Sequence, residues 1–338
     1  MRCFRLLLCA LIALALSPVP VEAATQSERH AAVKKKVVKK ARYKTRANAK
    51  RIIKTIRSNK AYHARTAAYQ READSVFDAS GGGELRLASS KALIVNQNTG
   101  ETIYAKSTNT PTPIASLTKL MTAMVLLDQR LPMDEPVSIG MEDVDTLKGT
   151  SSRLRVGTTL SRQEMLQLAL MSSENRAASA LARTSPQGMA GFIAAMNSKA
   201  AELGMTRTHF ADPTGLNSEN ISTAEDLVKM VKVAYQYPEI RDASTATEQQ
   251  VSVSGYRRPV AFRNTNVLVR NGEWVIGLSK TGYINEAGRC LVMQAQIAEQ
   301  PLIIVLLDSW GKYTRIGDAQ RIRKWMESST SGNRRSVG

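Results

Sequence analysis

The sequence predicts an α/β fold of the α+β type, with a largely antiparallel sheet built from both ends of one globular domain. Strand-like runs lie near both ends of that domain, and the segment between them carries helical signals. Strands and helices do not alternate regularly, as they would in a parallel sheet of βαβ units. We therefore expect helices that flank the sheet and a helical subdomain inserted between its strands, over residues 84–328.

The chain begins with the features of a secretory signal peptide. Arg2 and Arg5 precede a short apolar run, and small residues follow it up to Ala23. The run is shorter than the about 20 residues that a transmembrane helix needs. We expect residues 1–23 to be removed during export, which would place the protein in a periplasm. An uncleaved membrane anchor is the alternative.

A strongly basic arm precedes the domain. Residues 29–71 contain 16 Lys or Arg and no Asp or Glu, whereas residues 72–338 contain 29 basic and 27 acidic residues. Most of the net charge of +18 therefore lies in residues 24–83, which end in the glycines 81–83. Such a tract is typical of a disordered tether. Contact with anionic envelope polymers or a membrane surface is the functional alternative, and export makes nucleic acid an unexpected partner.

Cysteine and histidine usage indicates neither a disulfide nor a metal. Cys3 and Cys9 belong to the predicted signal peptide, so Cys290 would remain alone, without an internal partner. It lies in an apolar run and is expected to be a small buried hydrophobe. The three histidines are scattered, two of them in the basic arm. We expect no metal and no cofactor.

The elements of the domain are predicted from local patterns. Residues 92–95 and 102–105 are predicted to be the two strands of a hairpin, with Asn98, Thr99 and Gly100 in its turn. Capping boxes at Ser161 with Glu164 and at Ser222 with Glu225 predict two helix starts. The remaining predicted elements are alanine-rich helices over 174–183 and 188–204, strands over 274–280, 289–298 and 301–310, a closing helix over 315–328, and a polar tail over 329–338.

An apolar helix after Pro113 holds a lysine close to a serine. Ser116 and Lys119 are three positions apart, so on a helix they share one face. A serine hydroxyl needs a base to become a nucleophile. Lys119 can be that base only when neutral, and burial together with the cation Lys280 would lower its pKa. A capping serine and a lysine that reaches the surface are the structural alternative.

Two further motifs follow in the chain. Ser173 and Asn175 form Ser-x-Asn at the start of an alanine-rich helix, and Lys280, Thr281 and Gly282 end a predicted strand. Each motif is weak alone, but the three in this order are typical of a serine acyl-transfer site.

Residues Asp212, Asn217 and Asn220, in "DPTGLNSEN", are expected to be structural turn residues.

On these motifs the sequence resembles the penicillin-recognising serine peptidases. The stretches "PIASLTKLMTAMV", "DPTGLNSENISTAEDL" and "LSKTGYINEAGRC" are similar to the low-molecular-mass penicillin-binding proteins. "SSENRAASALA" and the residues around "GLSKTGYINEAGRCLVMQ" are more similar still to the D-alanyl-D-alanine endopeptidase branch. Glu174 stands where the motif set has aspartate. The resemblance runs from Leu85 to the closing helix and implies a β-lactamase/transpeptidase-like fold.

The resemblance also implies roles for the motif residues. Ser116 would be the nucleophile and Lys119 its base. Ser173 would relay a proton to the leaving amine, and Asn175 would hold Lys119 and the substrate amide. The oxyanion hole would consist of the backbone N–H groups of Ser116 and Tyr283.

The Lys-Thr-Gly strand is implied to bind substrate. Lys280 and Thr281 would bind a carboxylate or the peptide backbone, and Gly282 would let the substrate lie close against the strand. The activity so implied is a serine endopeptidase that hydrolyses D-alanyl cross-links in peptidoglycan and is inhibited covalently by β-lactams.

Three other functions stay open. A carboxypeptidase would trim D-alanine from pentapeptide stems. Carboxypeptidases of this family commonly carry a further β-rich domain and an amphipathic helix, for which the ten residues after the closing helix leave no room. A β-lactamase would need a deacylating base that the sequence does not identify. A non-catalytic envelope-binding protein, held by its basic arm, is the alternative from another class.

Overall fold

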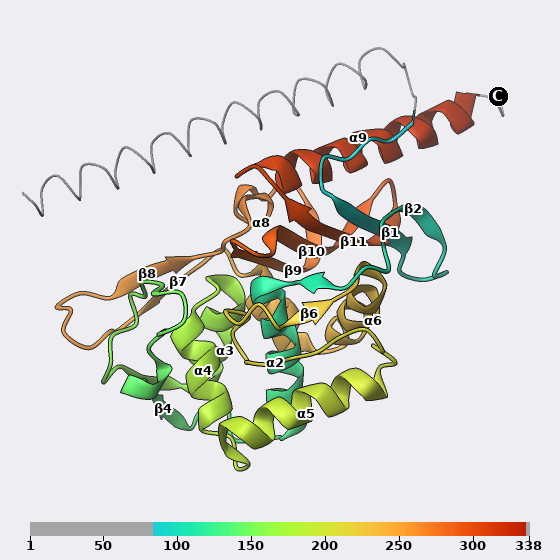
Figure 1. The fold of residues 1–338 in the computed structure, drawn as a ribbon. Coiled ribbons are helices and arrows are strands. Elements are labelled where there is room, and N and C mark those ends of the chain that lie inside the picture. Colours follow the sequence, from blue (N-terminus) through green and yellow to red (C-terminus); the bar gives the residue numbers. More distant parts are fainter. Residues whose placement is uncertain (1–83, 336–338) are drawn as a thin grey trace, which may run out of the picture. The chain divides into compact units, whose positions relative to one another are not determined.

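The main sheet of the protein is antiparallel and joins the two ends of the domain. The computed structural model describes residues 84–335, so the predicted signal peptide and basic arm lie outside the described residues. The strand order is β2-β1-β11-β10-β9, and each neighbouring pair is antiparallel. The five strands are β1 (Lys91–Asn96), β2 (Thr102–Lys106), β9 (Val275–Ile284), β10 (Gly288–Ile297) and β11 (Gln300–Ser309). The predicted fold class is confirmed (Figure 1).

The inner strands β10 and β11 are both buried over most of their length on both faces, as their nearly continuous apolar runs require. Ala298 and Glu299 join them with φ angles of 48° and 65°. Two consecutive positive φ angles match the right-handed twist of paired strands, which makes this a tight hairpin. Among residues 84–335, the strand β9 pairs with β10 alone and forms one edge of the sheet.

Helices cover both faces of the sheet (Figure 1). Along β11, Ile303 and Val305 pack into the larger apolar cluster, which contains the helices α2 (Thr118–Asp128) and α6 (Ala224–Ala234). The alternate residues, Ile304 and Leu306, pack into a second cluster with α9 (Thr314–Arg335). Successive side chains of a strand point to opposite faces, so one strand contributes to both cores.

The inserted helical subdomain surrounds α2. Every residue from Thr118 to Leu126 is buried, including Lys119. A helix that is buried on all sides is placed by tertiary packing, because no polar face directs it to water. The other helices are α3 (Arg162–Met171), α4 (Asn175–Arg183), α5 (Gly188–Glu202), α7 (Pro238–Thr245) and α8 (Val267–Asn271), with the 3-10 turns η1 (Ala115–Leu117) and η2 (Met141–Asp143).

Three pairs of short strands complete the fold: β3 (Thr112–Pro113) with β6 (Ile221–Ser222), β4 (Pro136–Ser138) with β5 (Thr159–Ser161), and β7 (Glu248–Val251) with β8 (Val260–Arg263). The hairpin of β7 and β8 extends away from the main sheet (Figure 1). Among residues 84–335, no helix is long and apolar enough to cross a membrane.

One of the two predicted capping boxes is confirmed and the other is wrong. Ser161 Oγ accepts the Glu164 N–H at 3.1 Å, and Glu164 accepts the Ser161 N–H at 2.8 Å. At α6 the N-cap is Thr223, which accepts from Asp226 N–H at 3.1 Å. Ser222 instead belongs to β6, where its pairing with β3 moves the helix start by one residue.

The closing helix is longer than predicted. It continues to Arg335, into the segment that the sequence indicates as a polar tail.

Cys290 is fully buried, as expected of a small hydrophobe. Burial raises the pKa of its thiol to about 11, so the thiol stays protonated at neutral pH.

Candidate active site

Ser116 and Lys119 are in direct contact. Ser116 lies in η1, after Ala115 with its φ of 49°, and Lys119 lies in the first turn of α2. Lys119 Nζ donates to Ser116 Oγ at 2.8 Å, to Asn175 Oδ1 at 2.7 Å and to the Thr214 carbonyl at 2.7 Å. These three acceptors match the three N–H donors of an ammonium group. The side chain is therefore buried with partners and does not reach the surface.

Burial lowers the pKa of Lys119 to about 7, and the nearby carboxylates of Asp212 and Glu174 oppose this shift. A lysine with this pKa is half neutral near pH 7, which gives it a lone pair that can take a proton. The sequence predicts that Lys280 lowers the pKa of Lys119, but Lys280 is not among the groups that shift it. Instead, Lys119 helps to lower the pKa of Lys280. Burial, Lys119 and Arg315 together hold the pKa of Lys280 well below its usual value.

A tight loop presents the Thr214 carbonyl to Lys119. The Asp212 carboxylate accepts the N–H groups of Thr214, Gly215 and Asn217 at 2.5, 2.7 and 2.6 Å. Asn220 Oδ1 accepts from Ala211 N–H at 2.9 Å and closes the loop. The turn roles predicted for Asp212, Asn217 and Asn220 are confirmed, and the turn they build supplies one of the lysine's acceptors.

Two glycines allow the chain to close around Ser116. Gly215 has a φ of +81°, and a Cβ there would lie 2.0 Å from the Ala115 carbonyl oxygen. At Gly282 a Cβ would lie 3.0 Å from the Ser116 nitrogen. The absent side chain of Gly282 thus brings β9 against η1, the turn that carries the nucleophile. This packing role is separate from the close approach of substrate that the sequence predicts for Gly282.

The second and third motifs meet on the other side of the site. Lys280, from β9, is buried and donates to Ser173 Oγ at 2.8 Å and to the Thr281 carbonyl at 2.9 Å. Ser173 has a φ of 60° and lies in the loop before α4, whose N-cap is Glu174. Ser173 is therefore not a helix cap, and its hydroxyl is free to interact with Lys280.

The remaining predicted residues, Thr281 and Tyr283, also lie on β9. Thr281 Oγ1 donates to Thr265 Oγ1 at 2.7 Å. Tyr283 follows Gly282 on the strand, and its half-exposed ring lies under the Arg289 guanidinium, 4.4 Å from the ring centroid. Tyr283 stands one residue beyond Gly282, the point where β9 contacts η1.

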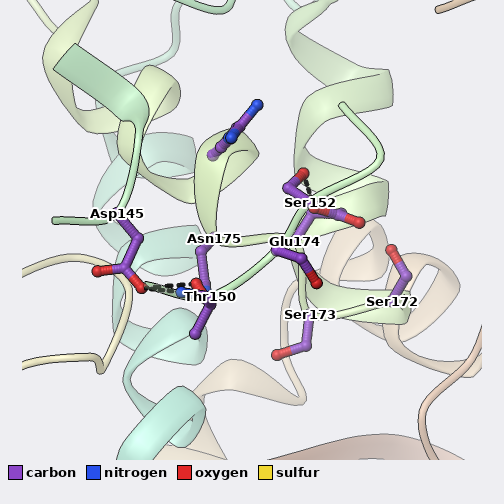
Figure 2. A pocket seen from close by; sticks show the side chains of 9 residues that line it. Asp145, Thr150, Ser152, Ser172, Ser173, Glu174 and Asn175 are labelled. Carbon is purple, nitrogen blue, oxygen red and sulfur yellow. Dashed lines mark hydrogen bonds between the residues drawn. The ribbon is translucent and has the colours of Figure 1, made fainter. Parts of the chain in front are cut away.

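A pocket of about 110 Å³ opens beside Ser173 and Asn175. Its polar lining comes from the α3–α4 loop, the start of α4 and the loop before β5, and Figure 2 shows these side chains around the pocket. Its lining residues are Asp145, Thr150, Ser151, Ser152, Ser172, Ser173, Glu174, Asn175 and Arg176. The pKa of Glu174 is raised by burial, against a 2.7 Å hydrogen bond from Ser152 Oγ.

Sequence reasoning did not identify the residues that support the motifs. Thr214 contributes a carbonyl oxygen, a group that every residue has. Asp145 and Thr150 lie in a polar loop without a motif, and Thr150 meets Asn175 across 25 residues. A turn-forming aspartate is the one local pattern that could have indicated Asp145. Its carboxylate accepts from the N–H groups of Leu147 and Lys148, as turn-forming aspartates do.

The fold and this arrangement define a class of protein. A serine in contact with a buried lysine, faced by a second lysine–serine pair on an edge strand, is the arrangement of the penicillin-recognising serine peptidases and β-lactamases. The profile of the peptidase S11 family, described as D-alanyl-D-alanine carboxypeptidase, matches residues 78–311. The chain belongs to this family of serine DD-peptidases.

Similar proteins agree with the family. The chain is 48% identical over 242 residues to a D-alanyl-D-alanine endopeptidase of Pseudomonas aeruginosa, covering 72% of this chain and 78% of that protein. Identity and coverage are the same for the D-alanyl-D-alanine endopeptidase of Escherichia coli K12. The crystal structure of the Streptomyces K15 DD-transpeptidase aligns with a TM-score of 0.67 at 30% identity, over 73% of this chain and 99% of that one.

Proposed function

We propose that the protein is an endopeptidase that hydrolyses D-alanyl cross-links between peptidoglycan strands through an acyl-enzyme on Ser116. The observation that carries this proposal is the 2.8 Å contact between Lys119 Nζ and Ser116 Oγ, with burial lowering the pKa of Lys119 to about 7. The 48% identity to two D-alanyl-D-alanine endopeptidases supports the choice of substrate.

Acylation begins with proton transfer from Ser116 Oγ to neutral Lys119. The oxygen attacks the carbonyl carbon of D-alanine, and the resulting oxyanion accepts from the backbone N–H groups of Ser116 and Tyr283. The C–N bond then breaks, and the proton that Lys119 took from Ser116 passes to the leaving amine by way of the Ser173 hydroxyl, which leaves Lys119 neutral again. Lys280 Nζ donates to that hydroxyl at 2.8 Å and orients it.

Deacylation returns the enzyme to its starting state. Water attacks the ester carbonyl, its proton passes to the Lys119 amine, and the C–O bond to Ser116 breaks. Lys119 then returns a proton to the serine oxygen. Asn175 holds the lysine through both steps, because its Oδ1 accepts from Nζ at 2.7 Å.

The substrate binds along β9. This strand is an edge of the main sheet, so its outer backbone groups can pair with an extended peptide. Lys280 and Thr281 lie on the same strand and supply a donor for a carboxylate or a peptide carbonyl. β-Lactams would acylate Ser116 in the same place and act as covalent inhibitors.

A D-alanyl-D-alanine carboxypeptidase is the alternative, since this activity gives the family its description. The two activities use the same residues and differ in the leaving group. The test is to offer purified mature protein a mixture of cross-linked muropeptide dimers and monomeric pentapeptides and to identify the products by mass. Conversion of dimers to monomers supports the endopeptidase, and loss of only a terminal alanine supports the carboxypeptidase.

The Ser116→Ala variant is the control for both outcomes. It should lose hydrolysis and covalent labelling by penicillin together. Labelling that persists in this variant contradicts the assignment of the nucleophile. If neither substrate changes with the wild-type protein, the proposed peptidase function is wrong.

We propose further that the protein is exported and works in the periplasm, where its basic arm contacts anionic envelope polymers. The 16 positive charges over residues 29–71 support this, since they face no acidic residue in the same stretch. Deletion of residues 24–80 should weaken binding to isolated sacculi and leave turnover of a small soluble substrate unchanged. Sacculus binding that survives the deletion, or that added salt does not reduce, contradicts the electrostatic role.

A further inference from the structure

A continuous chain of hydrogen bonds leads from the loop before β5 to the nucleophile. Thr150 Oγ1 donates to Asp145 Oδ2 at 2.7 Å and accepts from Asn175 Nδ2 at 3.2 Å (Figure 2). Asn175 Oδ1 accepts from Lys119 Nζ at 2.7 Å, and that nitrogen lies 2.8 Å from Ser116 Oγ. The loop is therefore connected to the reacting serine by an unbroken series of hydrogen bonds.

The direction of these hydrogen bonds is determined at Asp145. An ionised carboxylate can only accept. Burial raises the pKa of Asp145, but hydrogen bonds from Lys148, Thr150 and Leu147 outweigh it and lower the pKa overall. The carboxylate therefore stays ionised at neutral pH and takes the single hydroxyl proton of Thr150. Only lone pairs of that oxygen remain to face Asn175.

The consequence falls on the amide of Asn175. Its oxygen and nitrogen ends have nearly the same shape, so two orientations fit the same space. Because Thr150 offers only lone pairs, the NH₂ end faces Thr150 and the oxygen faces Lys119. The reversed amide would place its NH₂ group against the N–H donors of the lysine. A water molecule in place of the hydroxyl could donate or accept, and would favour neither orientation.

We propose that Asp145 and Thr150 are positioning residues that orient the Asn175 amide and, through it, the Lys119–Ser116 pair. This inference rests on the proposed function of Ser116 and Lys119. It adds two residues from a loop that none of the three motifs includes.

The same loop is tied to the substrate strand. Asp145 accepts the N–H groups of Leu147 and Lys148 at 2.8 and 3.0 Å and that of Thr150 at 2.8 Å, which holds the loop in shape. Lys148 Nζ pairs with Glu286 Oε1 at 2.5 Å. Glu286 lies in the turn between β9 and β10, so the loop that orients Asn175 also contacts the end of the strand that carries Lys280.

The test compares Thr150→Val with the wild-type protein. The measurement is the second-order rate of covalent labelling by a fluorescent penicillin between about pH 5 and pH 9. We expect the rate at the plateau to fall about 10-fold, since misplaced catalytic groups lose rates of this order or more. The midpoint of the acidic limb should move to lower pH, because an ammonium that loses the Asn175 acceptor is less stable.

Two matched variants separate positioning from folding. Thr150→Ser keeps the hydroxyl and should restore both the rate and the midpoint. Thr159→Val removes a hydroxyl outside the site, one that forms a 2.7 Å hydrogen bond with Ser138 Oγ. This variant should keep the wild-type rate and midpoint. Thermal unfolding of each variant reports its fold. If Thr150→Val does not fold, Thr150→Ala makes the same comparison with a smaller side chain.

Three results would overturn the positioning role. These are a wild-type rate and midpoint in Thr150→Val, a slow rate without any shift of the midpoint, and a Thr150→Ser variant as slow as Thr150→Val. In each case a labelled wild-type protein and an unlabelled Ser116→Ala variant leave the peptidase function standing. An unlabelled wild-type protein overturns that function itself, so the two failures are distinguishable.

Discussion

Lys280 Nζ lies 2.8 Å from Ser173 Oγ, across 107 residues of sequence, with the lysine 1% exposed. The contact joins the edge strand of the sheet to the loop before α4. Burial of an amine beside a neutral hydroxyl is costly for stability, because the hydroxyl does not balance a positive charge. This relationship leads to the first prediction.

Lys280→Met should slow covalent labelling by penicillin by about 100-fold, because loss of one preorganised donor in an active site has an effect of this size. Its thermal unfolding midpoint should stay the same or rise, because the variant no longer buries an amine. Lys280→Arg, which retains a donor, should be less impaired. A variant that unfolds at lower temperature in proportion to its lost activity would argue for a structural role alone.

The rate of acylation should rise with pH through about 7. Burial lowers the pKa of Lys119 to about 7, so the lysine is protonated and inactive as a base below this value, and neutral and active above it. The measurement is the labelling rate at constant ionic strength, with Ser116→Ala as the blank. A rate that does not change between pH 5 and pH 9 would exclude Lys119 as the base.

Gly215→Ala should reduce labelling by about 100-fold, the effect expected when a nucleophile is displaced by about 1 Å. A Cβ at this position would lie 2.0 Å from the Ala115 carbonyl oxygen and would push η1 out of place. Gly100→Ala is the matched control: its φ is +76°, but a Cβ there meets nothing within 4 Å. Both variants carry the cost of a left-handed alanine, about 1–2 kcal/mol, and only the first should lose activity.

Ser161→Ala should lower the free energy of unfolding by about 1 kcal/mol without changing the labelling rate. Ser161 Oγ accepts from Glu164 N–H at 3.1 Å at the start of α3, and the variant leaves that N–H without its partner. Urea unfolding measures the change, and Ser161→Thr, another capping residue, should retain most of the stability. A slower labelling rate in Ser161→Ala would show that α3 also holds the site.

Local signals predicted the parts of the fold that depend on neighbours in sequence. The capping box at Ser161 needs four residues, and the hairpin at Gly100 needs one turn, so both could be predicted. The second box, at Ser222, was wrong because Ser222 pairs with Thr112 in β3, more than a hundred residues earlier. No local pattern carries that information.

The candidate site divides in the same way. Contact between Ser116 and Lys119 follows from their spacing of three along a helix. The meeting of Lys280 with Ser173 could be expected only from a resemblance to a family in which the three motifs act together. Thr150 could not be predicted, because its hydroxyl gains its meaning from Asp145 on one side and Asn175 on the other.

The sequence by itself determined the strands of the main sheet, most of the helices and the antiparallel class of the sheet, and its three motifs hold the residues on which the chemistry is proposed to depend. Tertiary structure alone decided the lowered pKa values of Lys119 and Lys280 and the partners that the motif side chains meet. The shift in the pKa of Lys119 to about 7 comes from its burial among α2, the Thr214 loop and Asn175, which lie far apart in the chain. Desolvation depends on everything that surrounds a group, and only the folded chain defines those surroundings.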